Sequence, residues 1–286
     1  MTVGPGLVGV YGGGRMGAGI AHAFALAGRE VVVVETSAAS SAAAYGRIEA
    51  TLRRAEERGA LSGSARSVLE RVRTTSDPAE LSEAVLVVEA VPEDADLKVA
   101  VLASVEHHAP RAWLASNTSS LSIDRLAAGL SRPERLVGLH FFNPVPVMKL
   151  VEVVRTISTS DETFDAVYGF AKSLGKEPIK THDNSGFIVN RLLVPYLLDA
   201  VRALEEGVGS REDIDKGMEL GCGHPMGPLK LLDFVGLDTT YAIAEIMWAE
   251  YREKRFAPPP LLKRMVLAGR YGKKSGRGFY EYGGDR

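Results

Sequence analysis

The 286-residue sequence has little cysteine, no excess of one charge and no long hydrophobic run, and each absence narrows the possible functions. The single cysteine, Cys222, cannot form a disulfide within the chain, which fits a reducing compartment and predicts a cytoplasmic protein. Lys and Arg total 34 against 36 Asp and Glu, so a formal net charge of −2 provides no global attraction for nucleic acid or for an anionic membrane. No apolar run approaches the ~18 residues of a membrane helix, and we expect no membrane association.

Metal-site patterns are also missing. The six histidines show neither H-x-x-x-H nor Cys/His spacing, so the sequence predicts no metal site. Cys222 has no catalytic motif around it, and we interpret it as a small packing residue.

The first part of the chain repeats one unit: a short β-branched run, a turn, and an Ala- and Leu-rich stretch with helical spacing. Continuous apolar strands of this kind are buried on both faces, which predicts a mostly parallel sheet between helices, a Rossmann-like doubly wound α/β fold. The expected helices include Ala18–Ala27, Ala38–Gly59 and Leu97–His108. The predicted strands are Leu7–Tyr11, Val31–Glu35, Val85–Ala90, Trp113–Ser116, Leu136–His140, Leu150–Val154 and Pro178–Thr181.

From Phe187 onward the strand signal disappears, which predicts an all-α second domain. We place the boundary near residue 184, with a sheet domain over 1–184 and a helical domain over 185–286. Asp183–Gly186 is expected to be a hinge and a helix N-cap, and Phe279–Tyr282 a closing segment packed on the sheet domain. The predicted helices are Phe187–Glu206, Arg211–Leu220, Leu237–Glu253 and Pro260–Gly269, with a turn-rich stretch at Gly221–Pro228.

A glycine-rich turn directly follows the first predicted strand and leads into a helix. Gly12, Gly14 and Gly17 form G-x-G-x-x-G, with Arg15 and Met16 inside the motif. The first glycine permits a tight turn, the second lets the backbone approach a pyrophosphate, and the third lets helix and strand pack closely. The helix amino terminus then offers N–H groups to phosphate. The motif predicts dinucleotide binding.

An acid at the end of the second predicted strand supports this interpretation. Glu35 lies 18 residues beyond Gly17 (35 − 17), where a carboxylate can accept hydrogen bonds from the adenosine ribose. Its charge would repel a 2′-phosphate, so NAD is favoured over NADP. The alternative is a glycine-rich turn without a ligand, which is disfavoured because strand, helix and acid all fall at the required spacing.

Several longer motifs run through both predicted domains, and the His-Phe-Phe-Asn-Pro block is the most specific of them. They are Ala115–Leu121, Gly138–Val153, Gly186–Tyr196, His224–Pro228, Asp233–Asp238 and Gly272–Tyr280. These motifs resemble the L-3-hydroxyacyl-CoA dehydrogenase family, and most closely its bacterial 3-hydroxybutyryl-CoA dehydrogenases, and the resemblance covers essentially the whole chain. One departure is Ser185, where many family members have proline before Gly-Phe-Ile-Val-Asn; it should alter the stiffness of the hinge and not the chemistry.

Two residues of neighbouring predicted strands suggest proton transfer. His140 ends one strand and Glu152 follows twelve residues on (152 − 140) in the next, so the two can meet. A carboxylate beside an imidazole fixes its tautomer and stabilises the imidazolium. Taken alone, His140 could be a structural core histidine, but the pair matches the family's catalytic dyad.

The resemblance implies two residues that hold the substrate oxygen, Ser119 and Asn190. N-capping and a polar helix start are the structural alternatives for them. Asn190 lies between Val189 and Leu192 on a helix that we expect to be otherwise buried, and an amide there needs a partner. Its role would place the site in the cleft between the domains.

Further contacts are implied by the resemblance alone. Cofactor contacts would be Glu93, Lys98, Asn143 and Lys274, and contacts to coenzyme A would be Thr51 and Arg58. The first two could equally be an exposed helical pair of little energetic value, and the last two a solvated helix face.

The implied activity is NAD-dependent oxidation of an L-3-hydroxyacyl-CoA, most suitably 3-hydroxybutyryl-CoA, to the 3-oxoacyl-CoA, or the reverse reduction. Two alternatives stay open: a dehydrogenase acting on a 3-hydroxyacyl group carried by an acyl carrier protein, and a non-catalytic NAD-binding protein like some lens crystallins. The large apolar helices around Leu192–Leu198 and Tyr241–Trp248, together with the resemblance, predict a homodimer through the helical domain.

Overall fold

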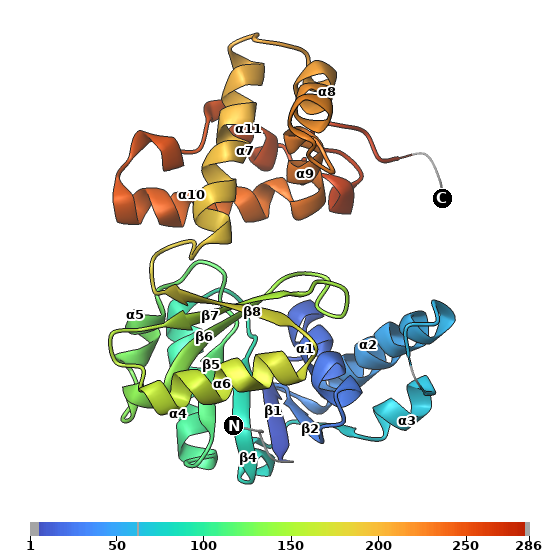
Figure 1. Ribbon diagram of the computed structural model, residues 1–286, viewed down its shortest axis with the longest axis vertical. Coiled ribbons are helices and arrows are strands. Elements are labelled where there is room, and N and C mark those ends of the chain that lie inside the picture. The colour runs from blue at the N-terminus through green and yellow to red at the C-terminus, as the bar shows by residue number, and fades with distance from the viewer. Residues whose placement is uncertain (1–5, 62, 284–286) are drawn as a thin grey trace. The chain divides into compact units, whose positions relative to one another are not determined.

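The computed structural model describes residues 6–61 and 63–283, and it divides into two compact units between Asn184 and Ser185. The first unit is built on a sheet and the second is helical (Figure 1). Among the described residues, no helix is both long enough and apolar enough to cross a membrane.

An eight-stranded sheet organises the first unit, with strand order β3-β2-β1-β4-β5-β6-β7-β8. All neighbouring strands pair in parallel except β6 and β7, which are antiparallel. The short connection over 142–149 explains this exception, because a parallel crossover needs about a dozen residues or more. The predicted mostly parallel α/β class is therefore confirmed. The strands are β1 Leu7–Tyr11, β2 Val31–Val34, β3 Val72–Thr75, β4 Ala84–Glu89, β5 Trp113–Ser116, β6 Leu136–Phe141, β7 Leu150–Arg155 and β8 Glu177–His182.

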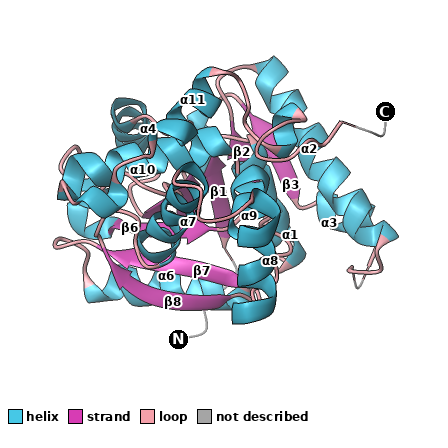
Figure 2. Cartoon of the chain, turned by 90° about the horizontal axis from the view of Figure 1, so that it is seen from above, coloured by secondary structure: helices cyan, strands magenta, loops and turns pink. Residues whose placement is uncertain are grey.

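Helices cover both faces of this sheet (Figures 1 and 2). Phe24 and Phe170 pack edge-on in one core layer with the inward valines of the central strands, such as Val8 and Val10, both fully buried. Serine and aspartate side chains cap several of the helices, among them Ser37 and Asp94. The helices are α1 Arg15–Leu26, α2 Ala38–Glu57, α3 Ala65–Leu69, α4 Ala95–His108, α5 Ile123–Ala127 and α6 Asp161–Ser173.

One strand, β3, was not predicted from the sequence. The edge strand β3 has the sequence Val-Arg-Thr-Thr, and only Val72 in it is buried. It pairs with β2 through its backbone, so no run of apolar side chains marks it.

The second unit packs its helices around Leu198, Leu232, Met247 and Phe256, all fully buried. The sequence did not predict α9, because its start was taken as part of a turn. The amino end of α9 is held by Asp215, whose carboxylate accepts hydrogen bonds from the N–H groups of residues 229 and 230 at 2.7 and 3.1 Å. This cap comes from another helix and leaves no local signal. The helices are α7 Val189–Glu205, α8 Arg211–Cys222, α9 Pro228–Val235, α10 Leu237–Tyr251 and α11 Pro260–Leu267.

The expected helix N-cap at Asp183–Gly186 is wrong. Helix α7 begins at Val189 after Ile188, and no side-chain hydrogen bond caps it. Asp183 instead accepts hydrogen bonds from the Ser122 hydroxyl at 2.8 Å and the Asp124 N–H at 2.7 Å, so it stabilises the start of α5.

Two expectations about the carboxyl-terminal part are also wrong. The segment Phe279–Tyr282 belongs to the helical unit, where its N–H and hydroxyl groups donate to Asp233 of α9. Cys222 is exposed and is not a packing residue, because α8 extends to it and it faces outward.

Candidate active site

The glycine turn joins β1 to α1, and its three glycines differ in what surrounds them. Gly12 has φ +96°, a conformation that L side chains rarely adopt, and a Cβ on Gly17 would lie 1.7 Å from the Gly12 carbonyl oxygen. Gly14 differs from both: its φ is −63°, and a Cβ there would meet nothing within 4 Å. The fold therefore does not require glycine at 14, and the open space in front of it fits a ligand that approaches the backbone closely.

Glu35 is held against this turn from the end of β2. Its carboxylate accepts hydrogen bonds from the Gly13 N–H at 2.6 Å and the Thr36 N–H at 3.2 Å. Arg15 is exposed and Met16 half-buried on the first turn of α1. These residues fit the adenosine diphosphate part of a dinucleotide: N–H groups at a helix start, space for phosphate, and a carboxylate for the ribose.

His140 and Glu152 face each other directly across β6 and β7. The imidazole Nδ1 lies 2.7 Å from Glu152 Oε2, and the side chains are 7% and 0% exposed. Because the carboxylate accepts the proton on Nδ1, the imidazole is held in the tautomer whose Nε2 can take a proton. The antiparallel register of these two strands thus places an imidazole of fixed orientation beside a buried carboxylate.

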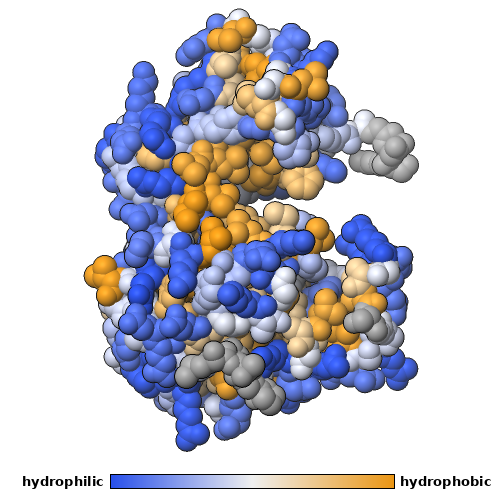
Figure 3. Space-filling view, viewed as in Figure 1, coloured by the Kyte–Doolittle hydropathy of each residue, from blue (hydrophilic) through white to orange (hydrophobic). Residues whose placement is uncertain are grey.

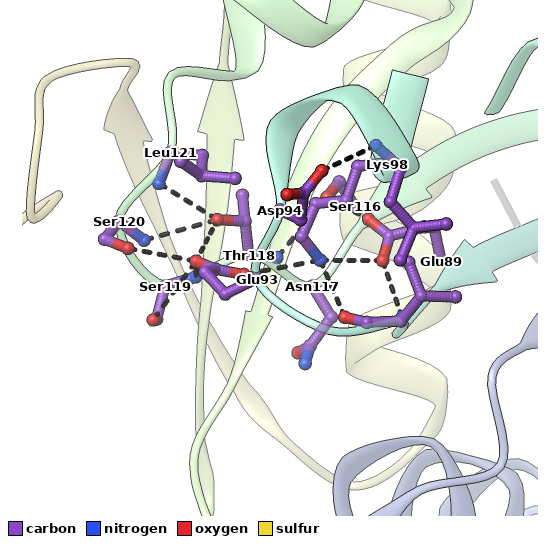
Figure 4. Close-up of polar contacts among 12 residues, drawn as sticks. Glu89, Glu93, Asp94, Lys98, Ser116, Asn117, Thr118, Ser119, Ser120 and Leu121 are labelled. Atoms are coloured by element: carbon purple, nitrogen blue, oxygen red, sulfur yellow. Dashed lines mark hydrogen bonds and ion pairs between the residues drawn. The ribbon is translucent and has the colours of Figure 1, made fainter. Parts of the chain in front are cut away.

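A loop after β5 gathers hydroxyl and N–H groups around the Glu93 carboxylate (Figure 4). Thr118 and Ser120 donate their hydroxyl groups at 2.5 and 3.0 Å, and Ser119 donates its N–H at 3.0 Å. Burial alone would raise the pKa of Glu93, but Lys98 and these donors together hold it below its usual value. Glu93 is therefore an anion that shapes the loop carrying Ser119.

Lys98 is not part of an exposed helical pair, so that alternative is wrong. Its side chain is 1% exposed, and its ammonium lies 2.7 Å from Glu89 and 3.3 Å from Glu93. Glu93 precedes α4, which starts at Ala95, so the two residues do not share a helix.

The other implied contacts of the sheet unit lie at separate places. Asn143 is exposed just after β6. On α2, the Thr51 hydroxyl contacts His22 Nδ1 at 3.0 Å and donates to the Ile48 carbonyl at 2.8 Å. Arg58 is exposed at the end of the same helix.

In the helical unit, Asn190 is half-buried on the first turn of α7. The expectation that this helix is otherwise buried is wrong for its first turn, because Leu192 is 66% exposed. Lys274 lies 2.7 Å from the Asp238 carboxylate at the start of α10.

The family is shown by sequence models that match both units. The model described as 3-hydroxyacyl-CoA dehydrogenase, NAD binding domain, matches residues 7–184, and the one described as 3-hydroxyacyl-CoA dehydrogenase, C-terminal domain, matches residues 186–282. The chain belongs to the 3-hydroxyacyl-CoA dehydrogenase family. The cofactor of this family's first domain is NAD, as the glycine turn and Glu35 predicted.

Curated and solved members of the 3-hydroxyacyl-CoA dehydrogenase family match over nearly their full length. A 3-hydroxybutyryl-CoA dehydrogenase of Mycobacterium tuberculosis is 49% identical over 279 residues, covering 96% of this chain and 98% of that protein. The mitochondrial hydroxyacyl-coenzyme A dehydrogenase of Sus scrofa is 45% identical, covering 96% and 90%. The crystal structure of (S)-3-hydroxybutyryl-CoA dehydrogenase from Ralstonia eutropha has a TM-score of 0.94 at 42% identity and covers 98% and 100%.

Sequence reasoning missed two residues that hold parts of the candidate site in place. Glu89 ends β4 fully buried and accepts hydrogen bonds from Lys98 and from the Ser116 hydroxyl at 2.6 Å. Asn117 accepts a hydrogen bond from the Phe141 N–H at 3.0 Å and so ties the Ser119 loop to β6. The available signal for Glu89 was an acid closing an otherwise apolar strand at the sheet edge where ligands bind.

Proposed function

We propose that the protein oxidises an L-3-hydroxyacyl-CoA to the 3-oxoacyl-CoA with NAD, or catalyses the reverse reduction, with 3-hydroxybutyryl-CoA and acetoacetyl-CoA as the preferred pair. The observation that carries the proposal is the buried contact of 2.7 Å between His140 and Glu152. It supplies an oriented base at the edge of a sheet whose glycine turn binds NAD. The names of the similar proteins support the acyl-CoA substrate.

In the oxidation, NAD supplies the hydride acceptor. His140 takes the proton of the C3 hydroxyl, and the Glu152 carboxylate stabilises the imidazolium that results. Ser119 donates a hydrogen bond to the substrate oxygen, and Asn190 polarises the carbonyl. In the reduction, the protonated His140 returns the proton to that oxygen.

The remaining residues bind the two larger molecules. Around the cofactor we place Gly12, Gly14, Arg15, Met16, Gly17, Glu35, Glu93, Lys98, Asn143 and Lys274, with Glu35 selecting NAD over NADP. For coenzyme A we place Thr51 and Arg58 on α2. The supporting observations are the open space at Gly14 and the anchored Glu35 carboxylate.

The test is acetoacetyl-CoA-dependent loss of NADH absorbance, followed over a series of acyl chain lengths. We expect turnover that is fastest with four carbons. Binding of NADH without turnover would indicate the non-catalytic alternative. A strong preference for the ester of an acyl carrier protein over the coenzyme A ester would favour the biosynthetic alternative.

We also infer a homodimer through the helical unit, in a cytoplasmic protein. Apolar side chains gather on part of this unit's surface in Figure 3. The exposed large apolar side chains of the unit include Leu192, Phe234 and Val235. Sedimentation equilibrium tests the dimer, and Leu192→Asp should shift the mass toward the monomer. A monomeric unmodified protein at micromolar concentration would contradict the assembly. Cell fractionation tests the location.

A further inference from the structure

The turn between β1 and α1 contains three consecutive glycines, Gly12, Gly13 and Gly14. Glycine loses more conformational freedom on folding than any other residue, and a turn of three glycines has no side chains of its own to restrict it. A dinucleotide needs one conformation of this turn, because the N–H groups must face the pyrophosphate together. Contacts from other elements are therefore needed to hold the turn.

Gly13 is the residue at which α2 approaches the turn. Helix α2 lies beside α1 (Figures 1 and 2), and a Cβ on Gly13 would lie only 2.3 Å from the Ala44 Cβ of α2. The close approach of helix and turn thus requires glycine at 13. Ala44 is fully buried, and Arg47 follows three residues on, so both project from the same side of the helix.

Two charged side chains hold the backbone of Gly13 at its two polar groups. Arg47 Nη1 donates a hydrogen bond to the Gly13 carbonyl oxygen at 3.1 Å, and the Gly13 N–H donates to Glu35 Oε1 at 2.6 Å. Hydrogen bonds to ionised groups are about twice as strong as those between neutral groups. Because the peptide bond is planar, a fixed carbonyl at residue 13 also fixes the direction of the Gly14 N–H, where the chain enters α1.

We propose that Arg47 is a positioning residue of the NAD site: from α2 it holds the Gly13 carbonyl oxygen and keeps the glycine turn in the conformation that binds the pyrophosphate. The proposal rests on the cofactor site proposed above for Gly12, Gly14 and Glu35. Arg47 acts through the turn and does not itself bind the cofactor. A turn that is already ordered loses less conformational entropy when the ligand binds, so the contact raises affinity.

The test variant is Arg47→Met, which removes the donor and the charge and keeps an unbranched side chain. Arg47 is exposed, so the variant should fold with an unchanged thermal unfolding temperature. Arg53→Met is the matched control, because it removes the same charge from the same helix at a side chain that is 67% exposed and pairs with Glu49. The dissociation constant of NADH is measured by its fluorescence, and those of ADP and adenosine by displacement of NADH.

We expect the dissociation constants of NADH and ADP to rise about 3- to 10-fold in Arg47→Met, which corresponds to the net contribution of one hydrogen bond. Adenosine has no pyrophosphate, so its dissociation constant should change by no more than about twofold, within ordinary additivity error. Arg53→Met should bind all three ligands within about twofold of the unmodified protein.

Amide hydrogen exchange of the ligand-free protein reports on the turn itself. Over residues 12–18, the N–H groups of residues 12, 13 and 18 donate hydrogen bonds and are therefore protected. Their exchange should become about 3- to 10-fold faster in Arg47→Met, because local opening costs less free energy without the anchor, and should not change in Arg53→Met. Arg47→Lys keeps a charged donor, so it should lie between Arg47→Met and the unmodified protein in both exchange and NADH affinity.

Weaker NADH binding in Arg47→Met with unchanged exchange over 12–18 would overturn the proposal, because Arg47 would then bind the cofactor directly. Faster exchange with unchanged NADH affinity would overturn it too, since the site would not need the anchor. An equal loss in Arg53→Met would indicate a general attraction by positive charge, and an equal loss for adenosine would exclude an effect through the pyrophosphate.

Failure of the unmodified protein to bind NADH would reject the cofactor site on which the proposal rests. Exchange over 12–18 needs neither ligand nor turnover, so it would still show whether Arg47 holds the turn. The two failures are therefore distinguishable.

Discussion

Each unit contains a pair of buried carboxylates, but the two pairs hold different kinds of group. In the sheet unit, Glu152 holds the imidazole of His140 and Glu89 holds the ammonium of Lys98. These partners carry a charge or exchange a proton. Both carboxylates lie near the ends of strands, at the edge of the sheet where ligands of α/β folds bind.

In the helical unit, Asp215 and Asp233 are 1% exposed, yet their partners are backbone N–H groups and tyrosine hydroxyls. They fix the start of α9 and the path of the carboxyl-terminal segment. Burial of a carboxylate therefore does not distinguish a reactive site from a structural one. The two units differ in the identity of the partners, and the consequence of this difference can be tested.

The largest effect is expected where the carboxylate holds a base. Replacing His140 by glutamine should lower kcat by about 10²- to 10⁴-fold, because no group remains to exchange the substrate proton. NADH affinity should stay nearly unchanged. Steady-state kinetics and NADH titration measure the two quantities. His108→Gln is the control, since His108 Nδ1 lies 2.8 Å from the Ser104 carbonyl oxygen of its own helix. Normal turnover of His140→Gln would reject its assignment as the base.

Two glycines of the same turn should also differ, because replacing one should weaken NADH binding and replacing the other should destabilise the fold. Gly14→Ala should leave the thermal unfolding temperature unchanged, since its Cβ meets nothing within 4 Å. It should raise the NADH dissociation constant by about tenfold or more, the equivalent of overpacking by 1–3 kcal/mol. Gly17→Ala should destabilise the protein itself, because its Cβ would lie 1.7 Å from a carbonyl oxygen. Calorimetry with and without NADH separates the effect on stability from the effect on binding. If Gly14→Ala bound NADH as tightly as the unmodified protein, the close approach of the cofactor to this glycine would be rejected.

A structural carboxylate should affect stability and not the site. Asp233 accepts hydrogen bonds from the N–H groups of Phe279 and Tyr280, both at 2.8 Å, and from the Tyr282 hydroxyl at 3.0 Å. Asp233→Asn leaves one acceptor oxygen for three donors, and the free energy of unfolding should fall by about 2 kcal/mol. Denaturant unfolding measures this, with the exposed Asp199→Asn as control. If Asp233→Asn weakened NADH binding as much as Gly14→Ala does, the expected contrast between the sheet unit and the helical unit would be contradicted.

The last effect, of similar size, concerns a second buried histidine, which contacts no carboxylate among the residues that the structure describes. His22 is 1% exposed and contacts the Thr51 hydroxyl; burial, with a contribution from Lys176, lowers its pKa to about 4. The folded state thus favours neutral His22, so this stability is present above pH 6.5 and is lost as the pH falls toward 4.

Between pH 7 and pH 5, the unmodified protein should lose about 2 kcal/mol more of its free energy of unfolding than His22→Gln. Urea unfolding at the two pH values measures the difference. Equal losses in both proteins would show that His22 is not held neutral by burial.

Much of the fold could be predicted from local patterns, because an apolar run or a glycine spacing acts within a few residues. The strands β1 and β5 appeared with the bounds that were expected. The failures have a common cause. The edge strand β3 is identified only by its pairing with β2, and the start of α9 is set by Asp215 from another helix. Neither partner is near in sequence.

The candidate site likewise contains residues that local patterns predicted and residues that they did not. The spacing of Gly12, Gly14 and Gly17 and the pairing of His140 with Glu152 could be anticipated, since both follow from consecutive elements of the sheet. Glu89 could not be recognised as a partner of Lys98 and Ser116, because three elements must come together before these side chains meet.

By itself the sequence determined the α/β class, the NAD-binding turn and the family, because these depend on short-range spacing and on motifs that match directly. Only the tertiary structure decided which groups the buried carboxylates hold. A carboxylate in the low-dielectric interior is stabilised by whatever donors lie around it. Those donors are an imidazole and an ammonium in the sheet unit, but mainly backbone N–H groups in the helical unit.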